Sequence, residues 1–229
     1  MSKLERVNGC AILNPDRVLE IYVIGLKGGK RGYFAPTDAL LFFEAQSDDR
    51  VRRTIAWLSN HRFRIVAWLG RVLDSAHGYY VRLEARLDPV ERILKAMDSA
   101  KRYAVLHSTA REPSVVEREF LTHLRRQRAK HVCWFIVDLV LSAASVTIAW
   151  LPGPNLVGWY PFLRSLSHYG AFTGARAALR SGNMEFKGLP EIRALEDNLH
   201  APGFDRTRIH AIVKDLKISG LEQYIERMF

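Results

Sequence analysis

The apolar run from Val132 to Leu151 constrains the fold of this chain more than any other feature of its sequence. Its twenty residues contain one charged side chain, Asp138. A helix of this length spans about 30 Å, which is the thickness of the hydrocarbon core of a bilayer. The run therefore predicts a helix that is either embedded in a membrane or buried in the centre of a helical bundle.

A proline-rich break follows this run and joins it to a second apolar arm. The break consists of Pro152, Gly153, Pro154 and Asn155. Two prolines around a glycine cannot continue a helix, and asparagine tolerates turn geometry. Beyond the break the pattern is again helical up to Leu179. We therefore interpret residues 131–180 as an apolar helical hairpin that is a candidate for membrane association.

Basic residues flank this hairpin. The strongest basic cluster of the chain precedes the first arm and comprises Arg125, Arg126, Arg128 and Lys130. The formal net charge of the chain is +10, which favours polyanionic partners such as anionic lipids or nucleic acid. No helix-turn-helix or single-strand-binding pattern supports nucleic acid. We therefore expect these four side chains to contact anionic membrane lipids.

Asp138 is expected to face a polar residue of the second arm, because a charge among apolar groups is costly without a partner. If the hairpin turns about Gly153, antiparallel packing brings Asp138 level with His168 and places Arg164 one turn nearer the break. We therefore predict a polar pair of Asp138 with His168 or with Arg164. Two roles are open for it: fixing the register of the two arms, which we favour, or relaying protons.

Small residues indicate where the second arm packs. Gly170 and Gly174 have the spacing that lets two helices approach closely. Residues 142–145 of the first arm form a matching surface of serine and alanine. We expect these glycines to pack the two arms against each other.

The rest of the chain divides into three further segments. In residues 1–47, the β-branched run Val18–Leu26 predicts a strand, and a glycine-rich turn leads to a second short strand near Tyr33. Residues 48–130 are predicted to form a basic helical region, and residues 181–229 three short helices, the second of them capped by Asp205.

Three helices are predicted within the basic region. Asp48 or Asp49 is expected to cap one helix, with another over residues 62–87. Asp88 is expected to cap a helix that begins at Pro89 and runs to about Leu106, with Glu91 completing a capping box.

Patterns typical of enzymes and metal sites are missing from the sequence. The segment 25–31 lacks the spacing of a phosphate-binding loop, no GxSxG occurs, and the eight histidines form no HExxH motif. The two cysteines, Cys10 and Cys133, form no CxxC pair. We therefore expect no catalytic residue, no cofactor and no metal.

Residues 151–179 resemble the signature region of the mitochondrial potassium/proton exchange-related proteins. The matching residues are Leu151, Pro152, Pro154, Asn155, Arg164, His168, Gly174 and Ala175. The resemblance is strongest over residues 131–229. It implies a location in the inner mitochondrial membrane or a prokaryotic plasma membrane, and a role in potassium–proton exchange. It does not imply that the chain is itself the exchanger.

We therefore predict a mainly α fold, a helical bundle with a small N-terminal β-hairpin and a membrane-associated helical hairpin. The expected function is a non-enzymatic, membrane-associated protein that supports potassium–proton exchange or cation homeostasis as a subunit or regulator. Its expected partners are anionic lipids and either an ion exchanger or a second copy of itself. The alternative is a soluble, basic helical module that binds nucleic acid or an acidic partner.

Overall fold

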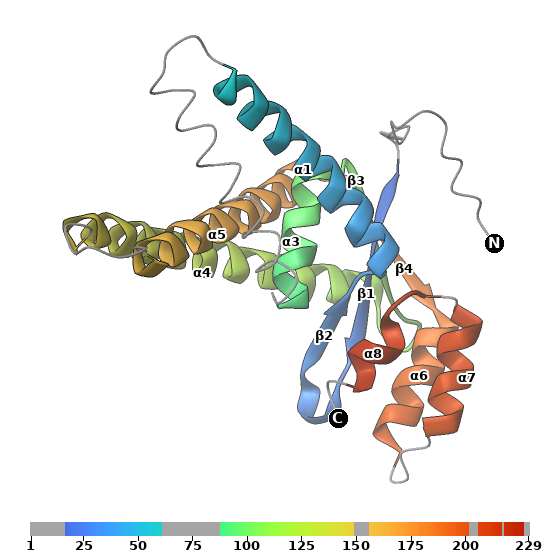
Figure 1. The fold of residues 1–229 in the computed structure, drawn as a ribbon. Helices are drawn as coiled ribbons and strands as arrows, with labels where there is room; N and C mark the ends of the chain where they lie inside the picture. The colour runs from blue at the N-terminus through green and yellow to red at the C-terminus, as the bar shows by residue number, and fades with distance from the viewer. Residues whose placement is uncertain (1–16, 61–87, 149–155, 202–205, 217, 227–229) are drawn as a thin grey trace.

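The computed structural model describes residues 17–60, 88–148, 156–201, 206–216 and 218–226 of the chain. A four-stranded β-sheet carries helices on both faces, and a long helical hairpin extends away from it (Figure 1). The strands are β1 (Val18–Gly25), β2 (Arg31–Phe34), β3 (Arg102–Ser108) and β4 (Met184–Leu189). The helices are η1 (Lys27–Gly29), α1 (Thr37–Ser59), α3 (Pro89–Ser99), α4 (Pro113–Ile148), α5 (Leu156–Ser181), α6 (Pro190–His200), α7 (Arg206–Leu216) and α8 (Leu221–Glu226).

The sheet is larger than the predicted hairpin, although the chain is mainly helical as predicted. Its strand order is β2-β1-β3-β4, in which β1 pairs antiparallel with β2 and parallel with β3, and β3 pairs parallel with β4. The β1–β2 pair confirms the predicted hairpin. Gly28 and Gly29 form its turn with φ angles of 75° and 74°, which favour glycine.

Strand β3 replaces the second half of a predicted helix. We expected the helix that Asp88 caps to reach Leu106, but α3 ends at Ser99 and the backbone of Ala100 is extended. Tyr103 and the five residues after it are all buried, since helices cover both faces of this central strand. A strand that is buried on both faces lacks an alternating pattern, so a short apolar run does not distinguish it from a buried helix.

Two apolar cores lie on opposite faces of the sheet. Alternate residues of β1 separate between them: Leu19, Ile21 and Val23 join the core formed with α1, α3, α4 and α5. Tyr22 and Ile24 join the core formed with α6, α7 and α8. The three short C-terminal helices are thus confirmed, and they follow the unpredicted edge strand β4. Asp205, predicted as a cap, lies outside the described residues.

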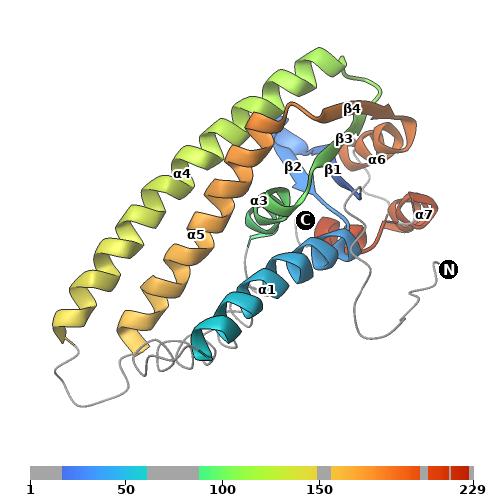
Figure 2. The ribbon, with the colours of Figure 1, turned by 90° about the horizontal axis from the view of Figure 1, so that it is seen from above.

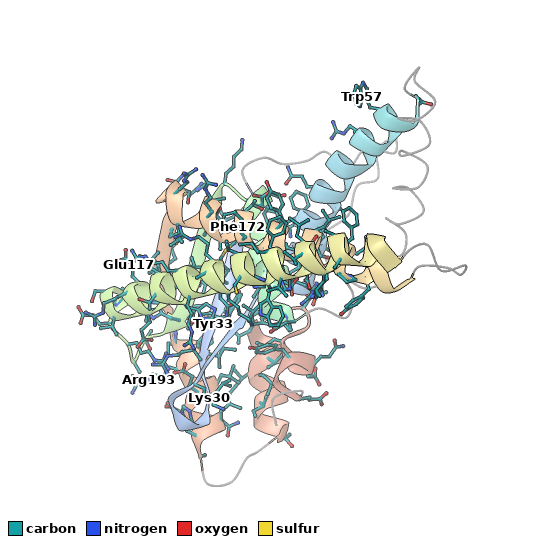
Figure 3. All side chains as sticks on the ribbon, turned by 90° about the vertical axis from the view of Figure 1, so that its left-hand side faces the viewer. Lys30, Tyr33, Trp57, Glu117, Phe172 and Arg193 are labelled. Carbon is teal, nitrogen blue, oxygen red and sulfur yellow. The ribbon has the colours of Figure 1, made fainter. Side chains whose placement is uncertain are left out.

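Helix α1 differs from its prediction at its centre. It continues through Asp48 and Asp49, so neither residue begins a new helix. Trp57 lies near its far end, at a distance from Lys30 on the β1–β2 turn (Figure 3). The helix predicted over residues 62–87 falls outside the described residues.

The beginning of α3 confirms one capping prediction and corrects another. The side chain of Asp88 accepts a hydrogen bond of 3.0 Å from the backbone N–H of Val90, and Pro89 is the first helical residue. Glu91 does not complete a capping box, because its carboxylate contacts Arg164 and Ser167 of α5 instead.

Helices α4 and α5 form the predicted hairpin and pack side by side (Figure 2). α4 continues without interruption over 36 residues, and α5 includes Pro161. The break at residues 152–155 lies outside the described residues. None of the helices in the described part of the chain is both long enough and apolar enough to cross a membrane. The predicted membrane-embedded form of the hairpin therefore has no support from these helices.

The two glycines of the second arm approach α3 rather than the first arm. A Cβ atom at Gly174 would overlap the backbone carbonyl oxygen of Leu94, whereas one at Gly170 would meet the flexible side chain of Lys95 at 3.5 Å. The close approach that their spacing predicts is present, but its partner is α3, which packs on one face of the sheet.

Gly174→Ala is expected to lower the free energy of unfolding by about 2–3 kcal/mol, because the methyl group forces α5 away from the backbone of α3. Gly170→Ala is the matched control. It is expected to change stability by less than about 1 kcal/mol, since alanine favours a helix over glycine and the side chain of Lys95 can move. Urea denaturation compares the two variants. Equal effects would contradict the close backbone contact.

Candidate functional site

A group of polar side chains, mostly buried, lies between α3, α4 and α5. We name it the buried polar cluster, and its members are Glu91, His131, Asp138, Arg164, Ser167 and His168. Glu91 comes from the first turn of α3. The two residues of α4 are seven apart, and in α5 Ser167 and His168 follow Arg164 by three and four residues, so each set lies on one face of its helix.

Glu91 is the anchor of this cluster. Arg164 donates two hydrogen bonds to its carboxylate, Nη1 to Oε1 at 3.1 Å and Nη2 to Oε2 at 3.0 Å, and the hydroxyl of Ser167 donates to Oε1. Burial acts to raise the pKa of Glu91, but the hydrogen bond from Ser167 and the charge of Arg164 outweigh it and lower the pKa. Glu91 is therefore ionised at neutral pH.

His131 and His168 form a pair across the two arms. Their Nδ1 atoms lie 2.9 Å apart. Burial and then the charge of Arg164 lower the pKa of His168 to about 4, and burial also lowers the pKa of His131. Both imidazoles are therefore neutral at neutral pH, and the N–H of one Nδ1 donates to the lone pair of the other.

Asp138 lies on the other side of His168. Its Oδ2 atom is 3.6 Å from Nε2 of His168, which is beyond hydrogen-bond distance, and this buried oxygen has no hydrogen-bond partner. Burial raises the pKa of Asp138, partly offset by Arg164. Since His168 is neutral, we treat the contact as one between a carboxyl group and a neutral ring rather than as an ion pair.

The structure thus brings together Asp138 and His168, one of the two predicted pairs. Arg164, the other predicted partner of Asp138, forms its ion pair with Glu91. Neither observation tests a proton relay. A relay through His168 requires this ring to accept a proton, which a pKa of about 4 opposes at neutral pH.

The predicted lipid-contacting residues lie outside the cluster. All four side chains are exposed on the first half of α4: Arg125, Arg126, Arg128 and Lys130. They are followed along the helix by large apolar side chains that are also exposed. Together with three residues of α5, these form the apolar face of the hairpin: Trp134, Ile136, Val137, Leu139, Val140, Leu141, Tyr160, Leu166 and Tyr169, each 39–61% exposed.

Sequence reasoning missed half of the cluster. Glu91 is predicted to complete a helix cap, whereas His131 and Ser167 belong to no site that the sequence predicts. One signal was available: His131 and Asp138 are seven residues apart in a continuous helix, which places both on the face toward the second arm. Nothing in the sequence indicates that Glu91 of α3 reaches this face.

Comparison with known proteins identifies the family. A family model described as mitochondrial K+-H+ exchange-related matches residues 44–180, which is more than half of the chain. The chain belongs to this family. The matched region includes every residue of the buried polar cluster and both arms of the hairpin. It extends further toward the N-terminus than the predicted resemblance over residues 131–229, and it ends before β4.

No curated protein and no solved structure matches the chain.

The histidines of the fold generate a pH dependence. The pKa of His168 falls from an ordinary 6.5 to about 4, and so does that of His123, which stacks on Tyr33. Between these values the unfolded chain binds protons that the folded chain does not, so the free energy of unfolding decreases as pH falls from about 6.5 to about 4.

We expect His168→Asn to make this dependence shallower, because the replacement has no titrating ring. Urea denaturation at several pH values within the window measures the slope. His200→Asn, at an exposed position on α6, controls for the removal of an imidazole from the chain. An unchanged slope in His168→Asn would contradict the assignment of a neutral, desolvated ring.

Proposed function

We propose that this chain is a non-enzymatic, membrane-associated protein that supports potassium–proton exchange, as a subunit or regulator rather than as a complete carrier. Membership of the mitochondrial K+-H+ exchange-related family supports the link to ion exchange. The observation that carries the proposal for membrane association is the distribution of polarity on the α4–α5 hairpin.

The polarity of α4 is inverted in its second half. The side chains that face α5 and are buried include His131, Asp138 and Ser145, whereas Ile136 and Val140 are 53% and 61% exposed. A helix packed on a water-soluble protein has the opposite arrangement, with apolar residues inward and polar residues outward. Exposed apolar surface of this extent is unfavourable in water. Contact of the outer face of α4 with an apolar environment would remove this unfavourable exposure.

Features adjacent to this apolar face favour a lipid surface as its surroundings. Arg125, Arg126, Arg128 and Lys130 are exposed, and the last of them precedes Trp134 by about one helical turn. A basic band beside an apolar face is typical of helices that bind anionic membranes. Trp134, Tyr160 and Tyr169 are amphipathic aromatic residues, which are enriched at membrane–water interfaces.

The packing of the hairpin supports a subunit or regulatory role. α4 and α5 contact each other directly along the described part of the hairpin (Figure 2), so two such helices enclose no pathway for an ion. Within the cluster, Glu91 already carries Arg164 as its counter-ion, which disfavours a monovalent cation there. A partner exchanger would then supply the pathway, and the inner mitochondrial membrane or a prokaryotic plasma membrane would be the location.

Membrane association is tested by flotation of the purified full chain with vesicles that contain anionic phospholipid or only phosphatidylcholine. We expect binding to the anionic vesicles. Val140→Asp is expected to reduce the bound fraction at least tenfold, because it places a charge in the apolar face. Ala194→Asp, exposed on α6, introduces the same charge away from the hairpin and is expected to bind like the parent. Equal flotation of the two variants would contradict the proposed membrane face.

The supporting role makes a separate prediction for transport. Liposomes that contain this protein as their sole protein are expected to show no potassium-driven proton movement above protein-free liposomes, measured with an entrapped pH indicator. Native membranes that lack the chain are expected to exchange potassium for protons more slowly than membranes that contain it. Robust exchange by the isolated chain would show that it is a carrier, and equal rates in the native membranes would exclude a role in exchange.

A further inference from the structure

We propose that Glu91, His131 and His168 form a binding site for a divalent transition-metal ion, with Zn²⁺ as the ion that fits this donor set. This inference goes beyond the proposed function and does not depend on it. One ligand atom from each of the three residues can be chosen so that all three lie within 4.8 Å of one another, and all three residues are buried. They come from α3, α4 and α5, so the site would tie the three helices together.

The geometry of the histidine pair is close to that of two ligands of one ion. Tetrahedral Zn²⁺ with Zn–N distances of 2.0–2.1 Å holds its nitrogen ligands about 3.3 Å apart. The Nδ1 atoms of His131 and His168 are 2.9 Å apart. The distance between them therefore has to increase by about 0.4 Å for both to bind the ion. The ion takes the place of the Nδ1 proton between the two nitrogens, and that proton moves to Nε2 of the same ring.

The surroundings of the three ligands resemble the outer shell of a metal site. Ser167 and Arg164 hold the Glu91 carboxylate in place, and a carboxylate oxygen has lone pairs for both a donor and an ion. If His168 binds through Nδ1, its Nε2 carries the proton. That nitrogen faces Oδ2 of Asp138 at 3.6 Å, the buried oxygen that has no hydrogen-bond partner. A carboxylate behind a metal-binding histidine orients the ring and makes it more basic.

The donor atoms, rather than the net charge, select the ion. Arg164 and Lys95 place positive charge beside the three ligands, so affinity for a cation has to come from the two imidazoles and the carboxylate. Two imidazoles and one carboxylate select a first-row transition metal over Mg²⁺ or Ca²⁺, which prefer oxygen ligands.

The test uses the full chain after treatment with a chelator and removal of that chelator. We expect calorimetric titration to give one Zn²⁺ per chain, and Co²⁺ to produce visible absorption bands of a nitrogen- and oxygen-ligated site that Zn²⁺ abolishes. His131→Gln and His168→Gln are each expected to raise the Kd at least tenfold and to remove the Co²⁺ bands. Asp138→Asn is expected to raise the Kd roughly 10- to 100-fold, as loss of an outer-shell partner does, and to leave the circular dichroism spectrum unchanged.

Two control variants remove exposed groups that bind metals adventitiously. Cys133→Ser on α4 and His200→Gln on α6 are expected to bind Zn²⁺ as the parent does. Absence of binding by the parent, full binding by the His131→Gln/His168→Gln double variant, or loss of binding in either control would overturn the proposal. If a histidine variant fails to fold, the Co²⁺ spectrum of the parent decides, because thiolate coordination at Cys133 adds intense near-ultraviolet bands. No vesicles are present, so failure here is distinct from failure of membrane association.

Discussion

The bidentate ion pair between Arg164 and Glu91 holds the hairpin to the body of the molecule. Glu91 is buried on α3, next to the sheet, and Arg164 lies on the second arm of the hairpin. Removing one partner of such a pair costs about 3–5 kcal/mol, because it leaves an uncompensated buried charge. The pair also sets the electrostatics of the whole cluster. The charge of Arg164 helps keep both histidines neutral and partly offsets the effect of burial on Asp138.

The sheet region and the α4–α5 hairpin, which this ion pair joins, have opposite distributions of polar and apolar side chains. Around the sheet, apolar side chains fill two cores and the edge strand β4 alternates between partly buried and exposed residues. This is the usual arrangement of an α/β structure in water. In the hairpin, polar side chains face inward and large apolar side chains face outward. The molecule therefore carries an ordinary folded body and an extended element whose outer face favours apolar surroundings, and the proposed membrane association follows from that contrast.

The buried cluster offers a second way to connect the hairpin to the body. Hydrogen bonds join α3 to α5 through Glu91, and the histidine pair joins α4 to α5. An ion bound by Glu91 and both histidines would join all three helices at one point. Its affinity would then report on the arrangement of the hairpin relative to the sheet, because ligands from three elements must converge within about 2 Å of the ion.

Local patterns in the sequence determined much of this fold. The β1–β2 hairpin, the cap at Asp88, the helical apolar run in the second half of α4 and the three C-terminal helices each follow from neighbouring residues, since capping, turn geometry and periodicity are local properties. The position of Asp138 opposite His168 also follows from the sequence. The two residues are equally distant from the break, and both helices have the same rise per residue. Tertiary structure alone decided the rest: that Tyr103 and its neighbours form a central strand, that Gly174 meets α3, and that Glu91 takes Arg164. These contacts join segments that are distant in the chain. The pattern of residues in one segment indicates that one of its faces is buried, but it does not indicate which segment packs against that face.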